Sequence, residues 1–224
     1  MLSCNDICLD YVEATRVTHA LKGVSLDFSP NKLHGIMGPS GSGKSSLLYI
    51  LCGLKSPTAG NVALDGTSIT NMSDAACARL RSQKFGFVFQ QPFLLNYLTA
   101  LENILVGINP DELSASVQKA ESLLSYLGLD GMGDKYPSML SGGERQRVAV
   151  ARALIGNPDV VFADEPTAAL DKDNGYKVMS ALADWAVDHT VIVVTHDADM
   201  LKGADVIHHL IGGCLVDDQS SNVR

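Results

Sequence analysis

Short apolar runs separated by turn signals fill the first third of the chain. The clearest of these runs are residues 7–12, 24–28, 33–37 and 61–64. Asp65 and Gly66 follow the last run and form a pair that is typical of tight hairpin turns. We therefore predict strands at these four positions, and we expect the first of them to pair partly antiparallel.

Helical spacing replaces this pattern in the middle of the chain, between residues 99 and 129. Apolar residues recur there every three or four positions, as they do on the buried face of an amphipathic helix. These residues are Leu113, Val117, Ala120, Leu124 and Leu127. Asn109 and Pro110 form a start signal, and Gly128 is a stop signal. The pattern predicts a small helical subdomain.

In the last third, strand-like runs alternate with a segment long enough for a helix. Apolar residues 160–163 and 191–195 lie on either side of the predicted helix 173–187. This alternation is typical of a parallel α/β sheet. A final hairpin over residues 206–216 turns at Gly212 and Gly213. We predict an α/β fold with a mostly parallel core sheet, an N-terminal antiparallel β subdomain and an inserted α-helical subdomain.

Composition and charge limit the classes of function. The chain has 224 residues, is 46% hydrophobic and carries a formal net charge of −8, which disfavours nucleic acid as its main partner. Its apolar runs are far shorter than the ~20 residues of a membrane-spanning helix. The N-terminus lacks the basic residues of a secretory signal, and the five scattered cysteines indicate reduced thiols. We expect a single domain, residues 1–224, that stays in the cytoplasm.

Residues 38–45 match the phosphate-loop pattern of Gly, four residues, Gly, Lys and Ser. A predicted strand precedes the loop, and the apolar residues Leu47, Leu48, Ile50, Leu51 and Leu54 continue it as a helix. Backbone N–H groups in such a loop bind an anion. Lys44 would reach the β- and γ-phosphates of a triphosphate, and Ser45 would bind the Mg²⁺ that accompanies it. The residues that we predict around the phosphates are Gly38, Pro39, Ser40, Gly41, Ser42, Gly43, Lys44, Ser45 and Ser46.

Polar side chains also follow three further predicted strands. They are Asp164 and Glu165 after residues 160–163, His196 after residues 191–195, and Gln90 after residues 87–89. The carboxyl ends of strands in an open α/β sheet form one ligand-binding edge. Asp164 and Gln90 would bind Mg²⁺ there, while Glu165 would activate the attacking water and His196 would bind the γ-phosphate. A base aimed at water predicts hydrolysis.

The remaining histidines have no comparable position in the pattern. We interpret all of them as structural or solvated, and they are His19, His34, His189, His208 and His209.

A second glycine pair, Gly142 and Gly143, opens another predicted helix. Ser141 and Glu144 around it form a capping box, which is a purely structural interpretation. Each glycine in a first helical turn lowers helix stability by about 1 kcal/mol relative to alanine, which a purely structural role does not explain. In the functional interpretation, the glycines expose backbone N–H groups that bind a second anion. Two phosphate half-sites in one chain suggest a head-to-tail dimer.

The order of these motifs resembles that of the ATP-binding subunits of ABC transporters. Residues 140–144, Leu-Ser-Gly-Gly-Glu, match the signature of that family between the phosphate loop and the carboxylate strand. The resemblance covers nearly the whole chain. It implies a P-loop NTPase fold with a RecA-like core and β subdomain over residues 1–90 and 157–224, and a helical subdomain over residues 91–156.

The resemblance also implies roles for residues that the other patterns leave open. Tyr11 would stack on adenine, and Asp171 would belong to the D-loop. Ser141, Gly142 and Gly143 would contact ATP bound by the other protomer of a homodimer that forms on ATP binding. The cofactors implied are ATP and Mg²⁺, and the activity implied is ATP hydrolysis coupled to transport, with Glu165, His196 and Lys44 in the catalytic roles.

Three segments look like the lipoprotein-release and macrolide-efflux branch of the family. They are residues 20–25, 89–92 and 98–103. This likeness implies an integral membrane permease as the partner, docked on residues 91–97 and the helical subdomain. It places the chain peripherally at the cytoplasmic face of the inner membrane.

Three alternatives share much of this chemistry. An ATP-switched scaffold would act with a membrane protein without transport, but the intact Glu165 and His196 favour hydrolysis. A soluble ABC ATPase acting on nucleic acid is disfavoured by the single cassette and the acidic charge. A P-loop kinase would be distinguished by a phosphorylated product in place of free phosphate.

Overall fold

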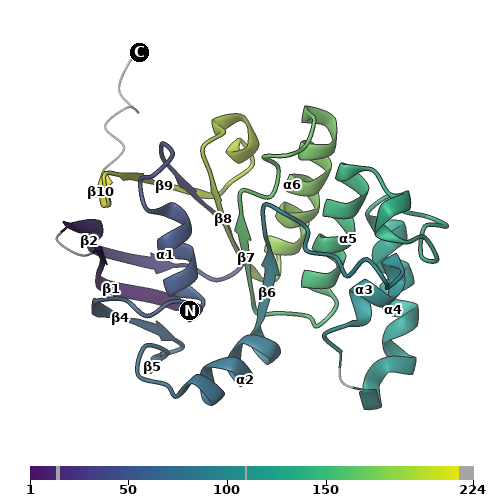
Figure 1. Cartoon of the computed structure of the whole chain (residues 1–224), viewed down its shortest axis with the longest axis horizontal. Coiled ribbons are helices and arrows are strands. Elements are labelled where there is room, and N and C mark those ends of the chain that lie inside the picture. Colours follow the sequence, from purple (N-terminus) through teal and green to yellow (C-terminus); the bar gives the residue numbers. More distant parts are fainter. Residues whose placement is uncertain (14–15, 109, 217–224) are drawn as a thin grey trace.

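The computed structural model describes residues 1–13, 16–108 and 110–216. Within these ranges, four strands form an antiparallel sheet in the order β2-β1-β4-β5 (Figure 1). The strands are β1 (Leu2–Glu13), β2 (Arg16–Phe28), β4 (Ala59–Leu64) and β5 (Thr67–Ser68). The predicted N-terminal antiparallel subdomain is therefore confirmed, with strands that are longer than predicted.

A second sheet forms the core, with six strands in the order β10-β9-β3-β8-β7-β6 in the described part of the chain. All neighbours pair in parallel except β10, which pairs antiparallel with β9. The strands are β3 (Leu33–Met37), β6 (Phe85–Val88), β7 (Val160–Asp164), β8 (Thr190–Thr195), β9 (Val206–Ile211) and β10 (Cys214–Val216). The predicted mostly parallel core is confirmed.

Two hydrophobic clusters cover the two faces of the core sheet. Side chains alternate between the faces of a strand, so Val160 and Phe162 of β7 pack toward α1 (Lys44–Leu51) and the antiparallel sheet. Val161 and Ala163 pack toward α5 (Gly142–Leu154) and α6 (Lys172–Ala186) on the other face. Burial on both faces explains why β7 has a continuous apolar sequence in place of an alternating one.

Helices lie on both faces of this sheet. The helices are α1 (Lys44–Leu51), α2 (Asp74–Lys84), α3 (Ala100–Leu105), α4 (Leu113–Tyr126), α5 (Gly142–Leu154) and α6 (Lys172–Ala186). Figure 1 shows α1 between the two sheets, and α3, α4 and α5 grouped on the far side of the core. Among the described helices, none is both long and apolar enough to cross a membrane.

Several predicted boundaries differ from the structure. Helix α1 ends at Leu51, so the prediction that Leu54 is helical is wrong, because Gly53 (φ 65°) turns the chain and leaves Leu54 48% exposed. The predicted helical middle contains both α3 and α4. The start signal proposed at Asn109 lies outside the described residues, and Pro110–Glu112 forms a 3₁₀ turn.

Candidate functional site

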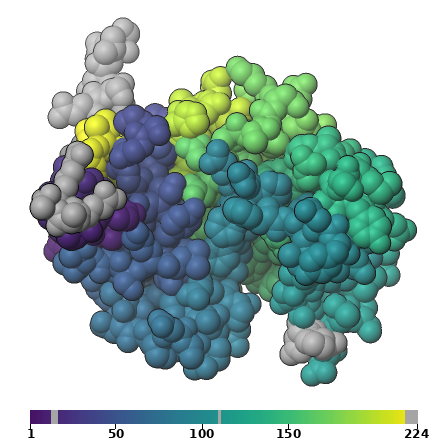
Figure 2. All heavy atoms as spheres, in the orientation of Figure 1, coloured from purple at the N-terminus to yellow at the C-terminus, as the bar shows by residue number. Residues whose placement is uncertain are grey.

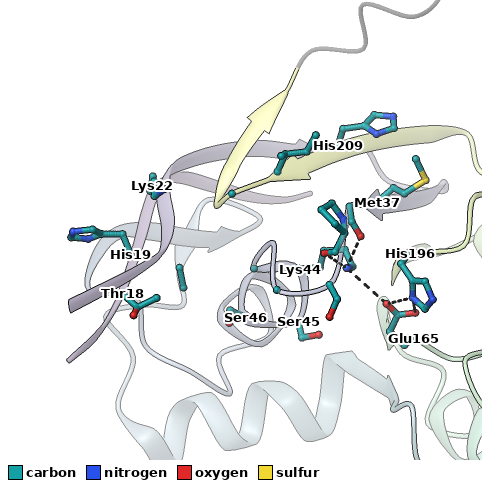
Figure 3. Close-up of a pocket in the computed structure, with 18 of the residues that line it drawn as sticks. Thr18, His19, Lys22, Met37, Lys44, Ser45, Ser46, Glu165, His196 and His209 are labelled. Carbon is teal, nitrogen blue, oxygen red and sulfur yellow. Dashed lines mark hydrogen bonds and ion pairs between the residues drawn. The ribbon is translucent and has the colours of Figure 1, made fainter. Parts of the chain in front are cut away.

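A cavity of 1220 Å³ opens at the carboxyl ends of the core strands (Figure 3). The loop between β3 and α1 forms one wall of the cavity. Gln90 follows β6, Glu165 follows β7 and His196 follows β8, and all three line the same space. The prediction that these groups lie along one edge of the sheet is confirmed.

The register of the parallel strands explains why these groups meet. Met37, the last residue of β3, pairs with Thr195, the last residue of β8. Asp164, the last residue of β7, pairs with Val194. Because the strands end at nearly the same level, the residue that follows each one lies on a common edge.

The loop after β3 lines the cavity and leads directly into the first turn of α1. Gly41 (φ 77°) and Gly43 (φ 101°) adopt left-handed conformations that favour glycine. Gly43 is the N-cap residue of α1, and no side chain of the described residues caps this helix end. Lys44 is 6% exposed, and its Nζ donates hydrogen bonds to the carbonyl oxygens of Gly38 (2.8 Å) and Pro39 (3.1 Å). The loop thus fits an anion through both its helix terminus and its buried cation.

Two residues of the loop are tightly enclosed. A Cβ atom at Gly38 would lie 2.0 Å from the carbonyl oxygen of Leu210, so the close approach of β9 requires glycine there. Ser42 differs from the other predicted residues between 38 and 46, all of them described, because it does not line the cavity. Its hydroxyl is buried and lacks a hydrogen-bond partner within the described ranges.

Ser45 and Asp164 form the candidate metal site. The Ser45 hydroxyl donates a hydrogen bond to Asp164 Oδ1 (2.8 Å), and Asp164 is 7% exposed. Ser45 and Gln90 line the cavity, whereas Asp164 lies behind Ser45 and is not one of the lining residues. Hydroxyl, carboxylate and amide oxygens are the donors that Mg²⁺ prefers, so these residues fit that ion. Tyr49, which the sequence analysis did not include, also donates to this carboxylate, through a hydrogen bond to Oδ2 (2.7 Å).

Glu165 has an unusual backbone and a well-anchored side chain. Its φ of 45° is rare for a residue with a side chain, and such strain is concentrated at functional sites. The Thr195 hydroxyl donates to its carboxylate (3.2 Å), and His196 Nδ1 lies 3.0 Å from both carboxylate oxygens. Lys44 Nζ lies 3.9 Å from Glu165 Oε1, and a dashed line marks this ion pair in Figure 3. A carboxylate, an imidazole and a cation therefore converge on one point of the cavity.

Tyr11 borders the cavity at the side of the antiparallel sheet. Its hydroxyl accepts a hydrogen bond from Lys55 Nζ (2.8 Å) and lies 3.1 Å from Ser46 Oγ. The Lys55 hydrogen bond lowers the pKa of Tyr11. His19 and His209 also line the cavity, a placement that the sequence did not predict. The side chain of His19 is 60% exposed, as expected of a solvated residue. Strands β2 and β9 bring both histidines there, and no local pattern in the sequence signals that placement.

The segment Ser141–Gly143 does not line this cavity of its own chain. The capping box around it is formed, since Glu144 N donates to Ser141 Oγ (3.3 Å) and Ser141 N donates to Glu144 Oε2 (2.6 Å). Asp171 also lies outside the cavity, where it caps α6 by accepting a hydrogen bond from Asn174 N (2.9 Å). The structure therefore brings together one group of predicted residues and leaves the other group apart.

Comparisons with known proteins agree on one family. A family model described as ABC transporter matches residues 21–168. The lipoprotein-releasing system ATP-binding protein LolD of Blochmanniella floridana is 38% identical over 220 residues, which are 96% of this chain and 93% of that protein. A dimeric structure of MJ0796, a bacterial ABC transporter cassette, has a TM-score of 0.88 at 36% identity and 96% coverage of both chains. A dimeric post-hydrolysis structure of MJ0796 bound to ADP and Pi has a TM-score of 0.86 at 35% identity and the same coverage.

Proposed function

The chain belongs to the ABC transporter family as an ATP-binding subunit with ATPase activity, and from that membership we propose the roles of its residues, its metal and its partners. Two copies bind Mg-ATP, close on it and drive a membrane permease. The convergence of Glu165, His196 and Lys44 on the phosphate loop carries this proposal. It supplies a base, a group that orients it and a cation in one cavity.

The phosphates of ATP occupy the loop between β3 and α1. Lys44 is buried and turns inward to two carbonyl oxygens, and a buried cation gains most from an anionic partner. Tyr11, at the other end of the cavity, offers its ring to adenine. Ser45, Asp164 and Gln90 hold Mg²⁺, which neutralises charge on the β- and γ-phosphate oxygens when it is bound.

Glu165 accepts the proton of the attacking water. The Thr195 hydroxyl and His196 anchor its carboxylate, so the base is oriented before the substrate arrives. The side chain of His196 is 62% exposed and the side chain of Glu165 14% exposed, so His196 has room to contact the γ-phosphate as well. Lys44 stabilises the negative charge that develops on the transferred group.

A head-to-tail homodimer completes each site. Ser141, Gly142 and Gly143 lie outside the cavity of their own chain, and within the described residues nothing lies within 4 Å of a Cβ atom placed at Gly142. This exposed helix start can therefore meet ATP bound by a second chain. The dimeric MJ0796 structures support the arrangement by similarity. Hydrolysis removes the γ-phosphate that joins the two halves, and the dimer reopens.

A second cavity of 480 Å³ is our proposed docking site for the permease. Figure 2 shows the hollow between α2 and the helical segment that contains α3. Its apolar lining residues include Phe85, Phe87, Phe89, Val106 and Ile108. Phe93 and Tyr97 nearby in the chain are 63% and 74% exposed, and exposed apolar surface of this kind is typical of a protein contact.

Hydrogen bonds connect the segment at residues 92–93, beside the proposed docking site, to helix α5. Arg152 of α5 donates hydrogen bonds to the carbonyl oxygens of Pro92 (2.6 Å) and Phe93 (2.9 Å). A shift of α5 on dimer closure would therefore move the segment that contacts the permease. We place the chain peripherally at the cytoplasmic face of the inner membrane, in a system of the export, lipoprotein-release or efflux type, as its similarity to LolD suggests.

Replacing the base tests this function directly. Glu165→Gln keeps the shape of the side chain but cannot accept a proton, so we expect ATP hydrolysis to fall by at least about 100-fold. ATP affinity should stay unchanged, and dimers should accumulate with ATP in light scattering. Steady-state phosphate release and binding of a fluorescent ATP analogue measure the two effects separately.

Glu121→Gln on α4 is a matched control, because it makes the same chemical change outside the cavity. It should hydrolyse ATP at the wild-type rate. Wild-type turnover in Glu165→Gln would contradict the assignment of the base.

A further inference from the structure

Two hydroxyl groups from one helix hold the Asp164 carboxylate, and the phosphate-loop pattern accounts for only one of them. Ser45 Oγ donates to Oδ1 (2.8 Å), and the Tyr49 hydroxyl donates to Oδ2 (2.7 Å). Ser45 and Tyr49 are four residues apart on α1, so they share one face of the helix. Both oxygens of a carboxylate that is 7% exposed are therefore hydrogen-bonded.

The backbone of Tyr49 is itself fixed in place. Its carbonyl oxygen accepts hydrogen bonds from Leu54 N (2.9 Å) and Lys55 N (3.0 Å), which close the end of α1. An ionised carboxylate can only accept hydrogen bonds, so the Tyr49 hydroxyl acts toward Asp164 as a donor.

We propose that Tyr49 is a positioning residue of the metal site, whose hydroxyl fixes the rotation of the Asp164 carboxylate toward Mg²⁺. This inference rests on the proposed function, in which Ser45 and Asp164 hold that ion. The terminal torsion of an aspartate is broad and has no sharp preference of its own. A donor on Oδ2 restricts that torsion and keeps Oδ1 beside Ser45. Partners of this kind commonly control metal affinity without contacting the metal.

Tyr49→Phe tests the proposal, because it removes the hydroxyl and keeps the ring. A fluorescent ATP analogue is titrated into the variant first in EDTA and then at increasing Mg²⁺ concentration. We expect unchanged affinity in EDTA, and about a tenfold higher Mg²⁺ concentration for the half-maximal effect of the ion on binding. The kcat for ATP at saturating Mg²⁺ should stay within about twofold of the wild type.

Tyr126→Phe is the matched control. Its hydroxyl also donates to a carboxylate, Asp184 Oδ2 (2.5 Å), but neither residue lines the nucleotide cavity. The control should show the Mg²⁺ dependence of the wild type.

Two results would overturn the proposal. One is a Mg²⁺ dependence of Tyr49→Phe that equals that of the wild type. The other is a loss of affinity that is as large in EDTA as in Mg²⁺, which would make Tyr49 a packing residue. Failure of the proposed function is distinguishable, because the wild-type chain would then show no Mg²⁺-dependent nucleotide binding.

Discussion

Helices α1 and α5 both begin at glycine-containing turns, yet they satisfy their first backbone N–H groups in opposite ways. The first N–H groups of any helix lack partners within the helix. Helix α1 begins after Gly43 with no side-chain cap from the described residues and no acidic residue in its first turn. Helix α5 begins after Ser141, which forms a complete capping box with Glu144. Helix α1 therefore leaves its first N–H groups available to a ligand, whereas the capping box of α5 provides hydrogen bonds at the start of that helix.

In the function that we propose, this difference means that the two glycine turns would contact phosphate by different means. The start of α1, together with Lys44, offers a charged and enclosed anion site within one chain. The start of α5 offers only the exposed backbone around Gly142, which would contact ATP when another chain closes over it in the proposed dimer. We expect one chain to suffice for binding ATP and two chains to be needed for hydrolysing it.

Removing the cation at the start of α1 should have the largest effect. Lys44→Ala deletes a buried ammonium group that the phosphates would contact through charge-assisted hydrogen bonds worth about 1.5–3 kcal/mol each. We expect ATP affinity to fall by about 1000-fold, measured by titration of a fluorescent ATP analogue. The loss should be the same at protein concentrations that favour monomers and at those that favour dimers.

Lys84→Ala is the control for the change in charge. Lys84 pairs with Asp159 at the surface (2.8 Å) and does not line the cavity. Its replacement should leave ATP affinity unchanged. Equal affinity in Lys44→Ala and the wild type would show that α1 does not form the phosphate site.

Most of this contrast could be predicted from the sequence, because both helix starts are local patterns. Glycine spacing and the capping box depend on residues within a few positions of one another. The strand at residues 160–164 could also be predicted, because burial of both its faces gives it an almost unbroken apolar sequence. Helix α2 was not predicted, because its sequence lacks the apolar stripe of an amphipathic helix. Among its described residues, only Cys77 is buried.

Contacts between distant segments could not be predicted in the same way. Tyr49 lies four residues after Ser45, but its partner Asp164 is 115 positions away in sequence. His19 and His209 enter the cavity from β2 and β9, whose approach to the phosphate loop depends on the packing of both sheets. Local patterns therefore predicted the proposed ligand-binding residues. The contacts that position them, such as that of Tyr49 with Asp164, depend on the tertiary fold.

The two glycines of the α5 turn should respond differently to alanine, which sharpens the comparison. A methyl group at Gly142 meets nothing within 4 Å in the described chain, so the fold should tolerate it and gain up to ~1 kcal/mol of helix propensity. It would nevertheless cover the backbone that faces ATP on the other protomer. We expect Gly142→Ala to retain the ATP affinity of the single chain and to lose about tenfold or more in turnover.

Gly143→Ala is the contrasting variant. Its Cβ would lie 2.8 Å from Asn174 Cγ, and Asn174 bonds both Arg147 (2.6 Å) and Asp171 (2.7 Å). We expect a loss of about 1–3 kcal/mol in the free energy of unfolding, measured in urea. Equal stability of the two alanine variants would contradict the packing argument, and wild-type turnover in Gly142→Ala would contradict the role of the exposed turn.

The smallest expected effect concerns the capping box that α1 lacks. Glu144→Ala removes the hydrogen bond to Ser141 N (2.6 Å) and should lower the free energy of unfolding by about 1 kcal/mol at pH 7. The hydrogen bond from the Ser141 backbone lowers the pKa of the Glu144 carboxyl below its ordinary value of 4.5. Because the folded state holds the charged form, the stabilisation is present above pH 4.5 and disappears as the pH falls through the lowered pKa. Urea titrations of both proteins should therefore converge in acid, whereas a constant difference down to pH 3 would show that the carboxylate charge contributes nothing to the cap.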